Sequence, residues 1–225
     1  SSEEVTGTMY AYPNQAAYGR SVPKTKIYQF AKPTRKLQQR IVDQVSRIVW
    51  QYKLSPETTN LSPRRSVSEI QVFTVALKSG ELSTDVLRCI DRAISFPIFF
   101  EIVFDERIKE MAAYKRVSDA DSAKWVVGDY FETAWQPVDS PREPLPVSLD
   151  LGKLYEQMLQ RLMPLPAHPG ESLKAHAERL GMIRSKENEC SKLEDRLKRE
   201  QQFNRKVELN AELRKVKSEL KHLLG

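Results

Sequence analysis

The sequence contains little of the material from which metal sites, disulfide frameworks and nucleotide-binding loops are made. Its 225 residues include two cysteines, three histidines and eight glycines. Cys89 and Cys190 are far apart, and no cysteine or histidine has the short spacing of a zinc site. The glycines form neither a dinucleotide-binding fingerprint nor a phosphate-binding loop. We therefore expect no cofactor and no metal, and the sequence favours a protein that is not an enzyme.

Long apolar runs are also absent. The most apolar stretch, "PIFFEIVF" at 97–104, is far shorter than the roughly 20 residues that a membrane helix needs. The opening residues "SSEEVTGTMYAYPNQ" have neither the basic nor the apolar region of a secretory signal. Two widely separated cysteines are typical of a reducing compartment. These features predict a cytoplasmic protein with no membrane contact.

Positive charge is abundant and unevenly placed. The net charge is +6, and residues 31–66 contain eight Lys or Arg against two acidic residues. Residues 67–105 have the reverse balance, with three basic and six acidic residues. A basic segment on a mild background is typical of contact with nucleic-acid phosphates, although a solvated helix face gives the same pattern. The candidate nucleic-acid-binding residues are Arg35, Lys36, Arg40, Arg64 and Arg65.

Periodicity predicts an α+β fold with a mixed four-stranded sheet and packed helices. Thr34 is a candidate N-cap for a helix whose apolar stripe runs from Leu37 to Tyr52 at spacings of three and four. Residues 10–33 are expected to be extended or looped. "EIQVFTVALK", a helix over "STDVLRCIDRAI" and "PIFFEIVF" predict two parallel strands joined by a crossover. "IKEMAAYKRV" and "KWVVGDYFETAW" would extend this sheet antiparallel.

The residues after 136 predict a different organisation. We divide the chain into an extended segment 1–33, an α+β core 34–136, a proline-rich crossing with one amphipathic helix at 137–170, and a helical arm 171–225. In the arm, the face of Cys190, Leu193 and Leu197 lies roughly 130° from the seam that starts at Leu209, if the helix is continuous. The arm is either one long helix with changing partners or a helical hairpin that reverses near 201–204. The lack of Gly and Pro there favours the long helix, whereas the shortness of the second seam favours the hairpin, which we prefer.

One arrangement raises the alternative of a nuclease. Metal-dependent nucleases often carry acidic residues and a lysine on adjacent core strands. Glu69, Glu101 or Asp105, and Lys115 lie on or beside predicted strands, but the compact Asp and Glu-x-Lys signature is missing. Lys115 could instead be the buried partner of Glu101, which would make both residues structural.

The stretch "WQYKLSPETTNL" at 50–61 has two interpretations. Pro56 disfavours a helical conformation at Ser55, and the polar residues that follow can hydrogen-bond the backbone. A capped turn that joins a helix to the sheet is one interpretation. The other is a polar recognition loop, which the nearby Arg64 and Arg65 favour.

Four segments together resemble a bacterial family called domain of unknown function 4391. They are "YPNQAAYGRSVPKTKIY", "VWQYKLSPETTNL" with "EIQVF", "AAYKR" with "KWVVGDYFETAW", and "KREQQFNRKVELNAEL". They occur in order through nearly the whole chain, although none of them is catalytic. The resemblance implies no active-site residues. It implies a place beside the DNA methyltransferase and helicase components of restriction-like or phage-defence systems.

We therefore expect a non-catalytic accessory subunit of a DNA-targeting defence or restriction-type assembly. Its arm would dock a helicase or methyltransferase subunit, and its basic segment would contact DNA phosphates. The alternatives are a metal-dependent nuclease or degenerate nuclease-like domain, and a stand-alone homodimeric structural protein. The candidate partner-binding residues are Phe203, Val207, Leu209, Leu213, Val216 and Leu220.

Overall fold

The computed structural model describes residues 7–64 and 66–225, and the chain divides into two compact units. The first unit ends at Pro166, and the second comprises Ala167–Gly225. Each unit has its own buried apolar cluster, and each is described by itself below. In the described part of the chain, no helix combines the length and apolar character required to cross a bilayer.

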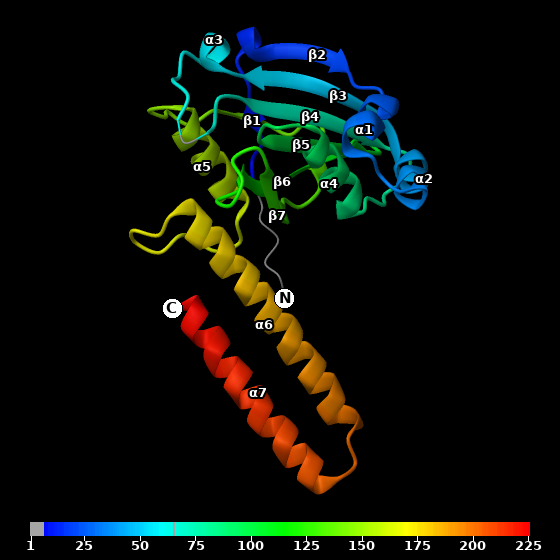
Figure 1. Ribbon diagram of the computed structural model, residues 1–225, viewed down its shortest axis with the longest axis vertical. Coiled ribbons are helices and arrows are strands. Elements are labelled where there is room, and N and C mark those ends of the chain that lie inside the picture. The colour runs from blue at the N-terminus through cyan, green and yellow to red at the C-terminus, as the bar shows by residue number, and fades with distance from the viewer. Residues whose placement is uncertain (1–6, 65) are drawn as a thin grey trace. The chain divides into compact units, whose positions relative to one another are not determined.

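The first unit contains a mixed seven-stranded sheet with the order β2-β3-β4-β5-β6-β7, in which β8 also pairs with β6 (Figure 1). Its central strands β4 and β5 are parallel, and the other pairs are antiparallel. The strands are β2 (Ala17–Ser21), β3 (Val45–Leu54), β4 (Ile70–Leu77), β5 (Ile98–Phe104), β6 (Arg107–Val117), β7 (Trp125–Glu132) and β8 (Gln136–Pro137). The α+β class and the four expected strands, β4 to β7, are confirmed. The number of strands was wrong, because β2, β3 and β8 extend the sheet.

Three helices cover one face of this sheet: α1 (Lys24–Ala31), α2 (Arg35–Gln44) and α4 (Thr84–Ala93). Thr34 caps α2 as predicted, accepting a hydrogen bond from the backbone N–H of Leu37. Apolar residues from all three helices pack against alternate residues of the strands, including Phe73, Phe100 and Met111. This cluster is the apolar core on this face of the sheet, and it holds the helices in place.

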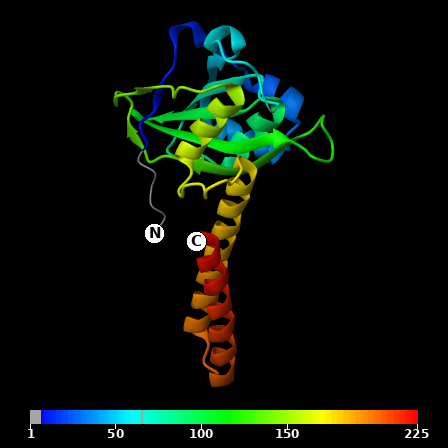
Figure 2. The same cartoon turned by 90° about the vertical axis from the view of Figure 1, so that its left-hand side faces the viewer.

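The opposite face is covered by α5 (Leu151–Leu162) and the N-terminal segment (Figure 2). Asp150 caps α5 by accepting from the N–H of Lys153. Tyr155 packs edge-on against Phe99, and its hydroxyl donates to the carbonyl of Ala113. The N-terminal strand β1 (Tyr10–Ala11) pairs in parallel with β9 (Glu143–Pro144). Both faces of the central strands are therefore covered, which explains their continuous apolar sequence.

The predicted helix from Thr34 to Tyr52 is wrong in its second half. The helix ends at Gln44, and residues 45–54 form β3, which pairs with β4. Register shifts interrupt the β3–β4 ladder between Val45 and Arg47 and between Trp50 and Tyr52. Val45 and Ile48 are both in the core although they are three residues apart, because a bulge changes the alternation of faces. The bulged strand thus imitates helical spacing.

The segments before α2 and after β3 also contain helices that the sequence did not predict. Residues 10–33, expected to be extended or looped, include the helix α1 and a short 3-10 turn, η1 (Asn14–Ala16). Ser55 begins a one-turn helix, α3 (Pro56–Thr59), and forms a capping box with Thr58. The stretch 50–61 therefore contains the end of a strand and a capped turn.

The second unit is a helical hairpin of α6 (Leu173–Arg199) and α7 (Phe203–Leu224) (Figure 1). Cys190 and Leu193 of α6 pack against the seam of α7. The chain reverses at 200–202 without Gly or Pro, because the Glu200 carboxylate accepts from the N–H groups of Gln201 and Gln202, each at 2.9 Å. This reversal explains why the apolar stripe changes direction along the sequence, and the hairpin interpretation is confirmed.

We expect Leu213→Asp to unfold the hairpin and leave the first unit folded. Leu213 is 8% exposed in the seam, and an unpaired carboxylate there would be buried without a partner. Circular dichroism should show loss of helix, and limited proteolysis should release a stable fragment that ends near Pro166. Ala211→Asp, on the exposed side of the same helix, is the matched control and should preserve the hairpin. Global unfolding of Leu213→Asp would contradict this independence.

Candidate nucleic-acid interface

A basic cleft lies between α2 and α4, with a volume of about 390 Å³. Lys36 and Arg40 are four residues apart and share one side of α2. They face Asp85, Arg88 and Arg92, which are three and four residues apart on α4. The cleft is lined by Thr34, Lys36, Leu37, Arg40, Asp85, Arg88 and Arg92. Four cations and one carboxylate therefore meet in one hollow of the surface.

Two of the four cations are held by the protein. Arg40 forms an ion pair with Asp85 at 2.8 Å, which links the two helices. Arg88 donates to the carbonyls of Val127 and Gly128 at 2.8 and 3.1 Å. Its guanidinium also lies 5.4 Å from the ring centroid of Tyr130. These contacts fix the positions of both guanidinium groups.

The other two cations, Lys36 and Arg92, make no hydrogen bond or ion pair with any residue that the structure describes. Both are exposed. Lys36 lies in the first turn of α2, where the positive end of the helix dipole disfavours a cation and favours an anion. The cleft therefore has the charge, and the unsatisfied donors, to bind a phosphate group.

The structure brings only some of the predicted nucleic-acid-binding residues together. Arg35, Lys36 and Arg40 are all on α2, the helix that leads directly into the first residue of β3. Arg64 lies beyond the other end of β3, a ten-residue strand about 33 Å long. Its guanidinium pairs with the Asp150 carboxylate at 3.1 Å. Arg65 lies outside the described residues.

Arg88 and Arg92 were not predicted, because they belong to a segment with net negative charge. The signal that could have found them is their position on the helix rather than the charge count. Asp85, Arg88 and Arg92 share one side of α4, and the ion pair with Arg40 turns that side toward α2.

The candidate partner-binding residues fall into two groups. Leu209, Leu213 and Val216 are buried inside the hairpin, and Leu220 is partly buried against them. They hold α7 on α6, so their apolar surface is not available to another molecule. Phe203 and Val207 are 77% and 50% exposed at the start of α7.

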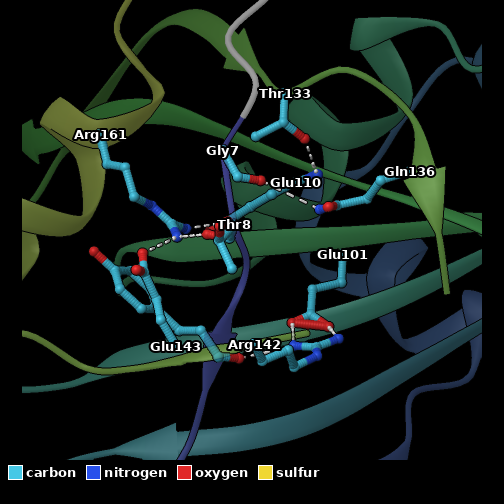
Figure 3. A network of polar contacts seen from close by, with 10 residues as sticks. Gly7, Thr8, Glu101, Glu110, Thr133, Gln136, Arg142, Glu143 and Arg161 are labelled. Atoms are coloured by element: carbon cyan, nitrogen blue, oxygen red, sulfur yellow. Dashed lines mark hydrogen bonds and ion pairs between the residues drawn. The ribbon is translucent and has the colours of Figure 1, made fainter. Parts of the chain in front are cut away.

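Buried carboxylates lie on the other face of the sheet, where Glu101 of β5 is in register with Glu110 of β6. Arg142 holds Glu101 through two hydrogen bonds of 2.8 and 3.1 Å, and its guanidinium also donates to the Tyr10 carbonyl (Figure 3). Arg161 of α5 forms an ion pair with Glu110 and covers the ring of Tyr10 at 3.7 Å. These contacts tie the N-terminal segment and α5 to the sheet.

The residues of the nuclease alternative are not assembled into one site. Lys115 is not the partner of Glu101, because the two side chains leave opposite faces of the sheet. Lys115 donates to the backbone carbonyl of Asp91 at 2.7 Å and to its carboxylate at 3.3 Å. Glu69 contacts Lys53 and Gln71 instead. In the described ranges, no group of three or more His, Cys, Asp or Glu residues is arranged to hold a metal ion.

The buried pair of Asp91 and Lys115 is a structural link between α4 and the sheet. Tyr130 also donates to the Asp91 carboxylate. Burial raises the pKa of Asp91 and lowers the pKa of Lys115, because both charged forms lose hydration. Each group partly offsets this effect on the pKa of the other through their mutual attraction.

A family model described as "Domain of unknown function (DUF4391)" matches residues 11–220. The chain belongs to this family. No curated protein and no solved structure gives a significant match. The family match extends over both units of this DUF4391 chain, so it includes the seven-stranded sheet and most of the hairpin.

The buried Glu110 should make the stability of this DUF4391 protein depend on pH. Burial raises its pKa from 4.5 to about 7, although Arg161 opposes that shift. The unfolded chain therefore loses this proton at a lower pH than the folded chain. The contribution of Glu110 to the free energy of unfolding is fully present below pH 4.5. It decreases as the pH rises from 4.5 to about 7 and does not change further above that value. The loss should be roughly 3 kcal/mol.

Chemical denaturation at several pH values between 4.5 and 8 measures this dependence. We expect Glu110→Gln to remove most of the decline, since the amide does not titrate. Glu132→Gln is the control, because Glu132 is exposed on the neighbouring strand β7 and pairs only with Lys109 among the described residues. An equal decline in Glu110→Gln and the unmodified protein would rule out this role.

Proposed function

We propose that this DUF4391 protein is a non-catalytic, cytoplasmic accessory subunit of a DNA-targeting defence or restriction-type assembly. Its first unit contacts DNA phosphates through the cleft between α2 and α4. Its hairpin docks a helicase or methyltransferase subunit. The observation that carries the proposal is the basic cleft, in which Lys36 and Arg92 have no hydrogen-bond or ion-pair partner among the described residues.

The arrangement of the cleft supports contact with phosphates rather than with bases. Asp85 offsets the charge of Arg40, whereas Arg88 is held by neutral backbone carbonyls and provides a fixed positive charge in the wall of the cleft. Lys36 and Arg92 keep donors available to an incoming oxygen anion. Such contacts position a protein on a duplex and carry no sequence information by themselves. An accessory subunit needs only this kind of contact if its partner selects the sequence.

The exposed residues at the start of α7 support the docking role. Phe203 and Val207 are four residues apart and therefore share one side of the helix. Helices commonly bind partners through apolar residues at this spacing, inserted into a groove. The seam residues behind them contribute by holding α7 in place.

The first test measures duplex binding against salt concentration. Each phosphate contact contributes about −0.9 to the slope of log affinity against log salt. Lys36→Ala with Arg92→Ala should make this slope less steep by up to about 1.8, equally for unrelated sequences, because two phosphate contacts are lost.

The control removes the same charge from the hairpin. Lys206→Ala with Lys215→Ala takes away two exposed lysines of α7 that form no ion pair with described residues. This variant should keep the original slope. If both double variants change the slope equally, binding follows net charge and not the cleft. If neither the unmodified protein nor the variants bind duplex at low salt, the DNA-contact proposal fails.

The second test concerns docking. The protein is co-expressed with a candidate helicase or methyltransferase partner, and complex formation is measured by size-exclusion chromatography. Val207→Asp should weaken the complex while preserving helicity, because residue 207 is half exposed and outside the seam.

Ser218→Asp is the matched control, since it adds the same charge at an exposed position of α7 about three turns beyond Val207 and should leave the complex intact. Equal binding by Val207→Asp and Ser218→Asp would contradict docking at this side. A homodimer that Val207→Asp disrupts, with no partner complex, would favour the stand-alone structural protein.

A further inference from the structure

A second cavity, with a volume of about 580 Å³, lies beside α1. Its walls come from β2, α1, the neighbouring strands β3 and β4, and the chain that joins α4 to β5. We name it the aromatic groove, because five aromatic side chains line it: Tyr18, Phe30, Trp50, Phe73 and Phe96. The basic cleft does not use these residues.

The aromatic groove is different from an ordinary gap in the core because one aromatic residue is exposed on its edge. Phe30 lines the groove and is 62% exposed, although it lies on a helix whose neighbouring Ile27 is buried. On the strand side, the ring of Tyr18 packs against that of Trp50, with centroids 4.2 Å apart and planes tilted by 44°. The guanidinium of Arg20 lies 4.6 Å from the Tyr18 centroid. A flat ring that enters the groove would therefore meet aromatic surface on more than one side.

The charges of the groove select an anionic ligand. Arg20, Lys26 and Lys53 line it together with a single carboxylate, that of Glu69. Lys53 lies 3.5 Å from Glu69 and offsets that charge. Arg20 and Lys26 are exposed at the groove and are not neutralised by any carboxylate that lines it. The groove thus combines aromatic walls with an excess of positive charge.

The interior of the groove also carries hydrogen-bond acceptors. Gln71 is 3% exposed and donates from its amide nitrogen to the Glu69 carboxylate at 2.6 Å. The amide oxygen of Gln71 is buried and has no hydrogen-bond partner among the described residues. A buried acceptor without a donor is costly, so a ligand that supplies an N–H group there would gain free energy. Exocyclic amines of nucleobases are such donors.

From these observations we propose that the aromatic groove binds a nucleotide with an amine-bearing base, either free or within a single strand. The base stacks against Phe30 and the aromatic wall at Trp50. Its amine donates toward Gln71 and Glu69, and its phosphate lies near Arg20 and Lys26. Aromatic stacking with cations along the backbone path is the general chemistry of single-strand binding.

The position of the groove relates it to the basic cleft without making it depend on that cleft. Arg92 lines the cleft, and the next residue, Ala93, lines the groove. Both cavities therefore open beside the last turn of α4. A strand unpaired from a duplex held in the cleft would have a nearby place for one base. The groove can also bind a nucleotide if the cleft does not contact DNA.

The test uses the full chain and fluorescently labelled single strands of twelve adenines, twelve cytosines or twelve thymines, with binding measured by anisotropy. The adenine and cytosine strands should bind more tightly than the thymine strand, which has no exocyclic amine. Phe30→Ala should weaken adenine-strand binding by about 5- to 150-fold, since base stacking on an aromatic residue contributes this much. Lys26→Ala should weaken it as well, because it removes an exposed cation.

Matched controls come from the hairpin. Phe203→Ala removes a phenylalanine that is 77% exposed, and Lys206→Ala removes an exposed lysine. Both should bind the adenine strand as the unmodified protein does. Because Phe30 and Lys26 are exposed, their variants should keep the original melting temperature, so a loss of binding is not a loss of folding.

Adenosine monophosphate, added as a competitor, distinguishes the two sources of the nucleotide. Competition at concentrations near those of the strand identifies a free nucleotide as a sufficient ligand, and competition only by strands identifies a nucleic acid. Equal loss in Phe30→Ala and Phe203→Ala, tightest binding of the thymine strand, or no binding of any probe would each overturn the proposal. Failure of the groove and failure of the cleft are distinguishable, because Phe30→Ala should leave the salt slope for duplex unchanged.

Discussion

Burial of the central strands on both faces is the constraint on which the rest of the first unit depends. Residues of β4 and β5 are apolar in both alternating sets, so each face of these strands needs a cover. The helices α1, α2 and α4 cover one face, while α5 and the N-terminal segment cover the other. Neither cavity would exist without this arrangement. The basic cleft lies between the covering helices α2 and α4, and the aromatic groove lies between α1 and the strands β2, β3 and β4.

The same constraint determines how the ionisable residues of the strands behave. Glu101, Glu110 and Lys115 lie on strands whose faces are covered, so each needs a partner of opposite charge. The partners come from distant parts of the sequence: Arg142, Arg161 and Asp91. Glu101 and Lys115, which the sequence raised as residues of a nuclease, link the sheet to its covers in the structure, and Glu110 does the same.

The sequence was sufficient for the parts of the fold that depend on local patterns. The strands β4 to β7, the cap at Thr34, and the hairpin seam all follow from periodicity and short motifs. The strand β3 could not be predicted in this way, because its bulges place Val45 and Ile48 on one face and imitate a helix. Strands at the side of a sheet also depend on pairing with distant residues, which periodicity does not contain.

The candidate site was predicted only in part, for a related reason. Clustering of charge along the sequence indicated Lys36 and Arg40 on α2, but it also indicated Arg64, which lies beyond the other end of β3. Arg88 and Arg92 complete the cleft from a segment whose net charge is negative. Phe30 and Trp50 are also separated in the sequence, and only the packing of α1 on the sheet makes them line one groove. Local counts cannot detect side chains that tertiary contacts bring together.

The reversal at 200–202 has a consequence for how the hairpin could meet another molecule. A glycine-rich turn would leave the first residues of α7 with many conformations, and docking would then lose that conformational entropy. Here the Glu200 carboxylate fixes the N–H groups of Gln201 and Gln202, and Phe203 follows immediately. The exposed ring is therefore presented from a backbone that is already ordered. Less of the contact free energy would be lost to ordering the turn, so even a small apolar contact could contribute usefully to binding.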